Sequence, residues 1–253
     1  MLCEIMKRKL KKTANYFGFQ LMRCPKIQDA SHYECITPNA TYAPWKQNSQ
    51  FMATYEKIKS HTLLDIYRCF ELWNLVEQSS KLQGSLIEIG TWRGGSGAII
   101  ATRANLSHIS DPVYLCDTFS GVVKTGQKDT FYKGREHSDT SLAIVEELIY
   151  TKLGLEKVKI LQGIFPDDTA RCIEDKLFRF CHIDVDAFRS AQEIVSWIWD
   201  KMTVGGVIVF DDYGFETCQG ITSFVNEYKH KKDCLFLHNL NGHAIFVKLA
   251  AIL

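Results

Sequence analysis

The chain has 253 residues and a mass of 29.0 kDa, which suits one sizeable domain with an appendage. Hydrophobic residues make up 46% of it, and 30 basic against 29 acidic side chains leave a formal charge of +1. This composition excludes a global electrostatic field that would select nucleic acid as a partner.

The N-terminus carries the one local excess of charge. Residues 1–28 contain seven Lys or Arg side chains against a single Glu, a local charge of +6. Apolar Ile5, Leu10 and Phe17 are interleaved with them, so the segment would suit an anionic membrane or an acidic carrier-linked sugar. A solvated or oligomer-packing helix is the more general interpretation.

No uninterrupted apolar stretch follows these basic residues, so neither a signal peptide nor a transmembrane helix is expected. The nine cysteines form no C-x-x-C pair, which is typical of buried thiols in a reducing compartment. Together these features predict a cytoplasmic protein.

The first sixty residues are predicted to lie outside the main domain. We expect a basic N-terminal segment followed by an irregular region, a candidate lid, within residues 1–60. The apolar spacing of Thr62–Lys81 predicts a helix that packs at the edge of a sheet. Residues 61–253 would form the domain that carries the chemistry.

From Leu82 onward, short β-rich runs alternate with helical patterns, which predicts a doubly wound α/β fold with a mostly parallel sheet. The expected strands are Ser85–Gly90, Pro112–Asp117, Lys157–Leu161, Phe180–Asp184, Gly206–Asp211, Cys234–His238 and Ala244–Leu249. The last two are joined by a short connection that contains Asn239-Leu240-Asn241-Gly242 and should pair antiparallel. Seven strands ending in such a hairpin are the inventory of the class I methyltransferase (Rossmann-like) sheet.

A glycine-rich turn follows the first predicted strand. Trp92 stands two residues after Gly90, so the G-x-G-x-x-G pattern of dinucleotide-binding folds fails. Glu88, just before the first glycine, would suit the ammonium group of S-adenosylmethionine. The alternative is a turn that binds no ligand.

An acidic residue ends the second predicted strand. Asp117 stands where a carboxylate accepts hydrogen bonds from ribose hydroxyls, and Phe119 would stack on adenine. The residues after the third strand would complete the adenine wall. The predicted cofactor-binding residues are therefore Glu88, Gly90, Thr91, Trp92, Arg93, Gly94, Ser96, Asp117, Thr118, Phe119, Gly121, Gly163 and Ile164.

Four aspartates follow the fourth and fifth predicted strands: Asp184, Asp186, Asp211 and Asp212. Because these strands are neighbours in the expected fold, their carboxylates should converge, and they would repel one another without a cation or bound protons. Oxygen ligands favour Mg²⁺, with Mn²⁺ or Ca²⁺ as alternatives. Any one of these aspartates alone would be interpreted as a helix cap.

The histidines point less directly to a function than the four aspartates do. His182 lies inside an apolar strand and is interpreted as a core residue. His137, with Arg135 and Tyr132, is a weak candidate for contact with substrate.

The sequence resembles the macrocin O-methyltransferase family, whose members modify sugars in macrolide and aminocoumarin biosynthesis. The resemblance covers about residues 62–247, and its carriers are IEIGTWRGGS (87–96), CDTFSG (116–121), QGIFPDDT (162–169), HIDVDAFRSA (182–191) and GGVIVFDDYG (205–214). It implies methyl transfer from S-adenosylmethionine to a hydroxyl of a sugar or related polyol.

The resemblance also implies residue roles. Asp184, Asp211 and Asp212 match the magnesium ligands of the family, and Asp186 matches the proposed general base. The family commonly has Tyr where this chain has Phe188. The implied partner is a sugar-containing small molecule, and a homo-oligomer is compatible with the sequence.

Three other functions are alternatives for a chain with this predicted fold. Trp92 opposes a nicotinamide-dependent oxidoreductase. A metal-dependent hydroxylase would need two histidines and one carboxylate, which the strand ends do not offer. A non-catalytic nucleoside-binding protein stays an alternative, although it would have no physical reason to retain four clustered aspartates.

Overall fold

The computed structural model describes residues 10–14, 16, 17, 19, 21, 26–36 and 40–250, which fall into two units, residues 1–40 and 41–253. Most of the basic residues on which the prediction of membrane contact depends lie outside the described residues. Within the described part, no helix combines the length and the apolar character needed to cross a membrane.

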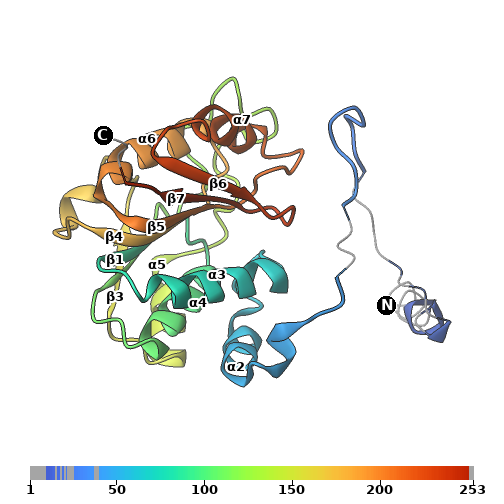
Figure 1. The fold of residues 1–253 in the computed structure, drawn as a ribbon, viewed down its shortest axis with the longest axis horizontal. Coiled ribbons are helices and arrows are strands. Elements are labelled where there is room, and N and C mark those ends of the chain that lie inside the picture. The colour runs from blue at the N-terminus through green and yellow to red at the C-terminus, as the bar shows by residue number, and fades with distance from the viewer. Residues whose placement is uncertain are drawn as a thin grey trace. The chain divides into compact units, whose positions relative to one another are not determined.

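A seven-stranded mixed sheet forms the centre of the second unit (Figure 1). The strand order is β3-β2-β1-β4-β5-β7-β6, with β7 antiparallel to both β5 and β6 and all other pairs parallel. The strand bounds are Ser85–Ile89 (β1), Val113–Asp117 (β2), Val158–Gln162 (β3), Phe178–Ile183 (β4), Met202–Phe210 (β5), Cys234–His238 (β6) and Ala244–Lys248 (β7). The predicted alternating organisation and the terminal hairpin are confirmed.

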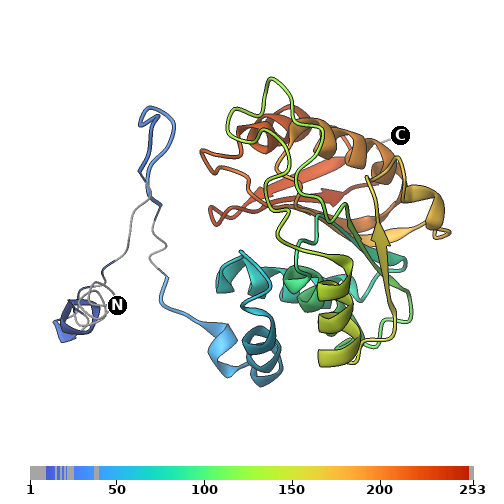
Figure 2. The same ribbon diagram turned by 180° about the vertical axis from the view of Figure 1, so that it is seen from behind.

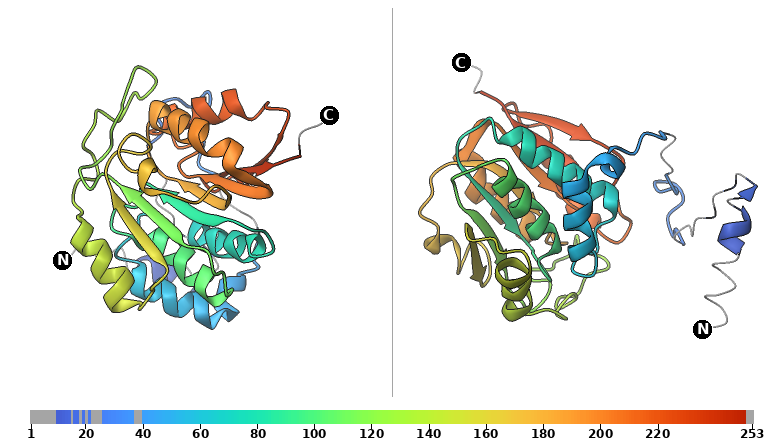
Figure 3. Two further views of the ribbon diagram at one scale, coloured as in Figure 1. Left: turned by 90° about the vertical axis from the view of Figure 1, so that its left-hand side faces the viewer. Right: turned by 90° about the horizontal axis from the view of Figure 1, so that it is seen from below.

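Helices cover both faces of the sheet, as Figure 3 shows in two views. One hydrophobic core packs strand residues such as Leu86 and Phe180 against α2, α3, α4 and α5. The other packs Ile87 and Cys181 against α6 and α7. The bounds are η1 Pro44–Gln47, α2 Ser49–Ile58, α3 Ile66–Ser79, α4 Gly95–Leu106, α5 Leu142–Glu146, η2 Glu147–Lys152, η3 Ala170–Cys172, α6 Phe188–Ile198, η4 Trp199–Lys201 and α7 Gln219–Tyr228.

The expectation that residues up to about 60 are irregular is wrong for Ser49–Ile58, which form α2. The side chain of Asn48 caps this helix by accepting a hydrogen bond from the backbone N–H of Phe51 at 2.9 Å. Phe51 is fully buried and its ring packs edge-on against Trp73. Sequence pattern missed the helix because its apolar face is short and polar residues surround it.

The helix predicted within Thr62–Lys81 is confirmed as α3, but it does not lie at the sheet edge. It packs beside α4 and contacts β4 and β5, which are central strands. Asp65 caps its N-terminus by accepting the backbone N–H groups of Tyr67 and Arg68. This placement brings the first turns of α3 over the ends of β5 and β7.

A long loop, residues 118–141, connects β2 to α5. Figure 2 shows it in light green, running up beside the layer of α6 and α7. Asp129 fixes this loop, since its Oδ1 accepts the backbone N–H of Phe188 at 2.9 Å, at the start of α6. The loop therefore forms a wall above the carboxyl ends of the parallel strands.

Candidate active site

A cavity lies at the carboxyl ends of the five parallel strands and receives residues from every one of them. Its lining includes Gly90 after β1, Asp117 at the end of β2, Gly163 after β3, Asp184 after β4 and Asp211 after β5. The segment 61–64 before α3 and the loop 118–141 supply its side walls. Open α/β sheets bind ligands at this position.

The glycine-rich turn after β1 borders the cavity, but neighbouring protein atoms explain its glycines. Gly90 has φ +87°, and a Cβ there would stand 1.6 Å from the carbonyl oxygen of Asp184. A Cβ on Gly95 would stand 2.5 Å from the carbonyl oxygen of His61. Close approach of backbone to backbone therefore requires these glycines, whether or not a ligand is present.

Asp117 organises this turn. Its Oδ2 accepts the backbone N–H groups of Thr91 and Trp92, both at 2.7 Å, and its Oδ1 accepts that of Phe119 at 2.7 Å. Burial raises the pKa of Asp117, and the three N–H donors partly offset that rise. The carboxylate thus ties the end of β2 to the loop after β1 while it borders the cavity.

The other predicted cofactor residues divide into two groups. Thr91, Trp92, Ser96, Thr118, Gly121 and Gly163 line the cavity together with Gly90 and Asp117. The remaining five do not line it: Glu88, Arg93, Gly94, Phe119 and Ile164.

The structure gives two of the five residues outside the lining a local structural partner. Arg93 forms an ion pair with Asp139 at 2.6 Å on the exposed side of the turn. Glu88 is fully buried below the turn, where its carboxylate bonds to the Thr91 hydroxyl and to His182. Glu88 therefore contacts the turn from beneath rather than the cavity.

Carboxylates gather at the opposite side of the cavity, after β4 and β5. Oxygen atoms of Asp184, Asp211 and Asp212 lie within 4.8 Å of one another. Burial and the charges of Asp211 and Asp212 raise the pKa of Asp184 well above its usual range, and burial with the charges of Asp211 and Asp186 does the same for Asp212. The cluster therefore holds more negative charge than its surroundings stabilise, and hard oxygen donors suit Mg²⁺ or a similar ion.

Asp186 lies in the same cavity and is 8% exposed. Burial raises its pKa, while hydrogen bonds from Asp212 and Tyr132 lower it in part. Both Asp186 and Asp212 have left-handed backbone, with φ +60° and +64°. Such conformations cost about 1–3 kcal/mol each and are found at functional sites.

Arg68 is a residue of this site that sequence pattern missed. Its Nη1 donates to both oxygens of Asp211, at 2.7 and 2.9 Å, and lies 3.6 Å from Oδ1 of Asp212. Burial alone would raise the pKa of Asp211, but Arg68 and His243 outweigh it and the pKa falls below its usual value. The sequence feature that could have revealed Arg68 is its position on the inward, otherwise apolar face of α3.

His182, which was expected to be a core residue, and His243 also belong to this part of the site. The structure places His182 and His243 beside Asp211, so a group of two histidines and one carboxylate does exist here, contrary to the expectation from the strand ends. The register explains it, because His182 on β4 is level with Val209 on β5, and His243 directly precedes Ala244, which pairs with Phe210. The sequence does not reveal that β7 lies beside β5.

Three residues of the loop 118–141 were candidates for contact with substrate: Tyr132, Arg135 and His137. Tyr132 and His137 line the cavity, whereas Arg135 does not. Tyr132 is 8% exposed, and burial with the charge of Asp186 raises its pKa. Its hydroxyl is therefore a neutral hydrogen-bonding group at the site.

The fold and the cavity together define a class of protein, the class I methyltransferases. Solved structures agree with this fold. The O-methyltransferase NovP superposes with a TM-score of 0.65 at 23% identity, covering 75% of this chain and 83% of NovP. An O-methyltransferase from Bacillus cereus, solved with SAH, gives a TM-score of 0.52 at 18% identity, covering 79% of this chain and 91% of the other.

Curated relatives point to the same class. The demethyldecarbamoylnovobiocin O-methyltransferase of Streptomyces niveus is 28% identical over 187 residues, which span 69% of this chain and 70% of the relative. The 8-demethyl-8-(2,3-dimethoxy-alpha-L-rhamnosyl)-tetracenomycin-C 4'-O-methyltransferase of Streptomyces olivaceus is 27% identical over 173 residues, spanning 63% and 65%. The second match thus covers just under two thirds of that relative.

Residues 39–246 match the family model described as Macrocin-O-methyltransferase (TylF). The chain belongs to this family and is an S-adenosylmethionine-dependent O-methyltransferase. Family membership favours methyl transfer over the hydroxylase and over the non-catalytic nucleoside-binding protein.

Proposed function

We propose that this enzyme methylates a hydroxyl of a sugar or related polyol, with the help of a divalent cation and with Asp186 as the general base. The observation that carries the proposal is the shared cavity, which the turn after β1 borders on one side and Asp184, Asp186, Asp211 and Asp212 border on the other. The donor and the acceptor would therefore meet at the ends of β1 and β4, which are adjacent strands.

The donor side fits S-adenosylmethionine. Asp117 keeps acceptor capacity beyond its three backbone donors, because a carboxylate offers about four lone-pair sites. It would accept a ribose hydroxyl, while Thr118 and Gly163 border the space for the adenine. S-adenosylmethionine would supply a methyl group on a sulfonium: an acceptor oxygen would attack the methyl carbon in line with the breaking carbon–sulfur bond, and S-adenosylhomocysteine would leave.

Glu88 would have an indirect role in binding the donor. The buried carboxylate would act on the donor through the Thr91 hydroxyl, which it bonds, rather than by direct contact with the ammonium group. Arg93 would stabilise the turn through Asp139.

The acceptor side fits a compound with several hydroxyl groups. Carboxylates accept hydrogen bonds and donate none when ionised, so four of them favour a substrate rich in O–H donors. The relative from Streptomyces olivaceus is named for methylation of a rhamnosyl compound, which supports a sugar as the acceptor. This chain has Phe188 where the family commonly has Tyr. A screen of acceptors is therefore needed to identify the sugar.

Asp184, Asp211 and Asp212 would hold the cation, since their oxygens already converge. A divalent ion at this position would lower the pKa of an acceptor hydroxyl and would orient it. The Arg68 guanidinium holds Asp211 in place and keeps it ionised.

Asp186 takes the proton of the acceptor hydroxyl at its carboxylate. The raised pKa of Asp186 suits this role, because a base is most effective when its pKa approaches the working pH. Tyr132 hydrogen-bonds to Asp186 and fixes its orientation. The segment 61–64 and the loop 118–141 restrict access of water to the reacting groups.

A screen tests this proposal. The enzyme is incubated with S-adenosylmethionine carrying a deuterated methyl group, Mg²⁺ and a panel of nucleotide sugars and glycosides, and products are read by mass spectrometry. We expect a labelled sugar ether with wild type and at least a hundredfold less with Asp186→Asn. Labelling confined to phenolic or amine acceptors in a parallel panel would overturn the sugar assignment.

A further inference from the structure

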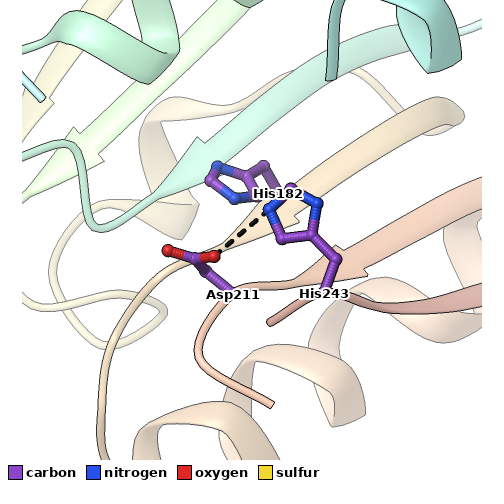
Figure 4. A group of neighbouring side chains, drawn as sticks. All are labelled: His182, Asp211 and His243. Atoms are coloured by element: carbon purple, nitrogen blue, oxygen red, sulfur yellow. Dashed lines mark ion pairs between the residues drawn. The ribbon is translucent and has the colours of Figure 1, made fainter. Parts of the chain in front are cut away.

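Two buried histidines, His182 and His243, lie beside Asp211 (Figure 4). Nitrogen atoms of His182 and His243 and an oxygen of Asp211 all lie within 4.8 Å of one another, and Nε2 of His243 is 3.2 Å from Oδ1 of Asp211. Both histidines are 0% exposed and Asp211 is 3% exposed. The three side chains come from β4, the end of β5 and the residue before β7.

Each histidine ring also contacts a carboxylate other than that of Asp211. Nδ1 of His182 lies 2.8 Å from Oε1 of Glu88, and Nδ1 of His243 lies 2.6 Å from Oε2 of Glu71. An ionised carboxylate only accepts hydrogen bonds, so each Nδ1 carries the proton of that bond. In the neutral imidazole this leaves the lone pair on Nε2.

Both Nε2 atoms are buried and neither makes a hydrogen bond of acceptable geometry among the described residues. A buried polar atom without a partner costs about 1–3 kcal/mol, and here two such atoms converge on one carboxylate. Imidazoles that donate Nδ1–H to a carboxylate and present a bare Nε2 are the arrangement found around protein-bound metal ions.

The charge of the group points the same way. Three carboxylates, those of Glu71, Glu88 and Asp211, surround the two rings, and Arg68, which contacts Asp211, also pairs with Asp65 and Asp212. Buried charge of this kind is expensive unless it is compensated. A bound divalent cation would compensate part of it.

We propose that His182, His243 and Asp211 bind a divalent transition-metal ion, with Zn²⁺ as the representative. The two imidazole nitrogens distinguish this site from the oxygen site of Asp184 and Asp212, because Mg²⁺ prefers oxygen whereas Zn²⁺ and Co²⁺ take imidazole readily. Asp211 borders both sites. The proposal does not depend on which acceptor the enzyme methylates.

The geometry needs only a small adjustment. Tetrahedral ligands at about 2.0–2.1 Å from zinc lie roughly 3.3 Å apart. Since the three ligand atoms are already within 4.8 Å, each pair closes by at most about 1.5 Å, which rotation of the side chains supplies. Arg68 remains on Asp211, because a carboxylate accepts more than the bonds it makes here.

Binding of the metal alone tests the proposal. The full-length chain, stripped of metal, is titrated with Zn²⁺ against a chromophoric chelator and with Co²⁺ in the visible range. We expect His182→Gln and His243→Gln each to weaken Zn²⁺ binding by tenfold or more and to abolish the intense Co²⁺ absorption of a nitrogen-containing site of low coordination number. Asp184→Asn, which alters only the oxygen site, and His108→Gln, an exposed histidine, should retain both signals.

A second measurement uses wild type only, in case a buried substitution prevents folding. X-ray absorption of the protein loaded with one equivalent of Zn²⁺ counts the imidazole ligands, and we expect two. Only oxygen ligands around the zinc in wild type, or equal zinc affinity in wild type and in a folded His182→Gln variant, would overturn the site.

Discussion

Glu71 on α3 and His243 before β7 are joined by a 2.6 Å contact between Oε2 and Nδ1, across 172 positions of sequence. The other ring nitrogen of His243 faces Asp211. Through His243, helix α3 therefore helps to orient the aspartate that follows β5. Asn239 and Asn241 also donate to Glu71, which fixes the turn between β6 and β7 on the same carboxylate.

Glu71→Ala should therefore lower kcat by roughly 10–100-fold, the usual effect of removing a residue that supports a metal ligand or catalytic group. It would also weaken binding of divalent metal, which a merely structural loss of α3 packing would leave unchanged in the folded fraction. Glu77→Ala is the matched control, since Glu77 lies on the same helix but pairs with Arg103 at a partly exposed position. Equal metal affinity and kcat in the two variants would show that Glu71 has no positioning role.

Asp117→Ala should weaken binding of S-adenosylmethionine by roughly 10–100-fold, as loss of charge-assisted hydrogen bonds of about 1.5–3 kcal/mol implies. The substitution removes the ribose acceptor and leaves the backbone N–H groups of Thr91, Trp92 and Phe119 without their acceptor. Calorimetry measures the change, with Asp200→Ala, an exposed aspartate, as the control. Unchanged affinity in Asp117→Ala would mean that the donor binds elsewhere in the cavity.

Asp184→Asn and Asp186→Asn should separate the metal ligand from the base. Asp186→Asn should retain Mn²⁺ binding, read by electron paramagnetic resonance, and lose about 10²–10⁴-fold in turnover. Asp184→Asn should weaken Mn²⁺ binding and recover part of its activity at high metal concentration. Wild-type activity that persists undiminished in excess EDTA would eliminate the cation from the mechanism.

Asp233 should make stability depend on pH. It accepts hydrogen bonds from the Trp199 indole at 2.9 Å and from Lys248 at 2.7 Å, and it thereby ties the β6–β7 hairpin to the end of α6. Burial alone would raise its pKa, but these two partners outweigh burial and lower the pKa from 3.8. A lowered pKa in the folded state means that the stabilisation is complete well above 3.8 and is lost as the pH falls through the folded value.

Asp233→Asn should accordingly lower Tm by roughly 2–4 °C at pH 7, which corresponds to about 1 kcal/mol in a domain of this size. The difference from wild type should shrink as the pH falls below 3.8. Glu227→Gln, in an exposed pair with Lys128, is the control and should change Tm little at any pH. A Tm difference that stays constant from pH 7 down to the acid range would rule out the charge of Asp233 as its cause.

The local patterns determined much of this protein. Alternation of apolar runs with helical periods predicted the strands and their order along the chain, and the five residues between β6 and β7 required an antiparallel hairpin. The same logic placed Gly90, Asp117, Asp184 and Asp211 at strand ends, because a parallel sheet collects the carboxyl ends of its strands on one side.

Tertiary structure alone decided which side chains meet. His243 reaches Asp211 only because β7 inserts between β5 and β6, and Arg68 and Glu71 reach the site only because α3 lies over central strands rather than at the edge. Whether Glu88 borders the cavity or lies beneath it depends on side-chain burial. Sequence spacing determines which residues share a strand face or a helix face, whereas contacts between distant elements depend on the packing of the whole sheet with its helices, which no local period encodes.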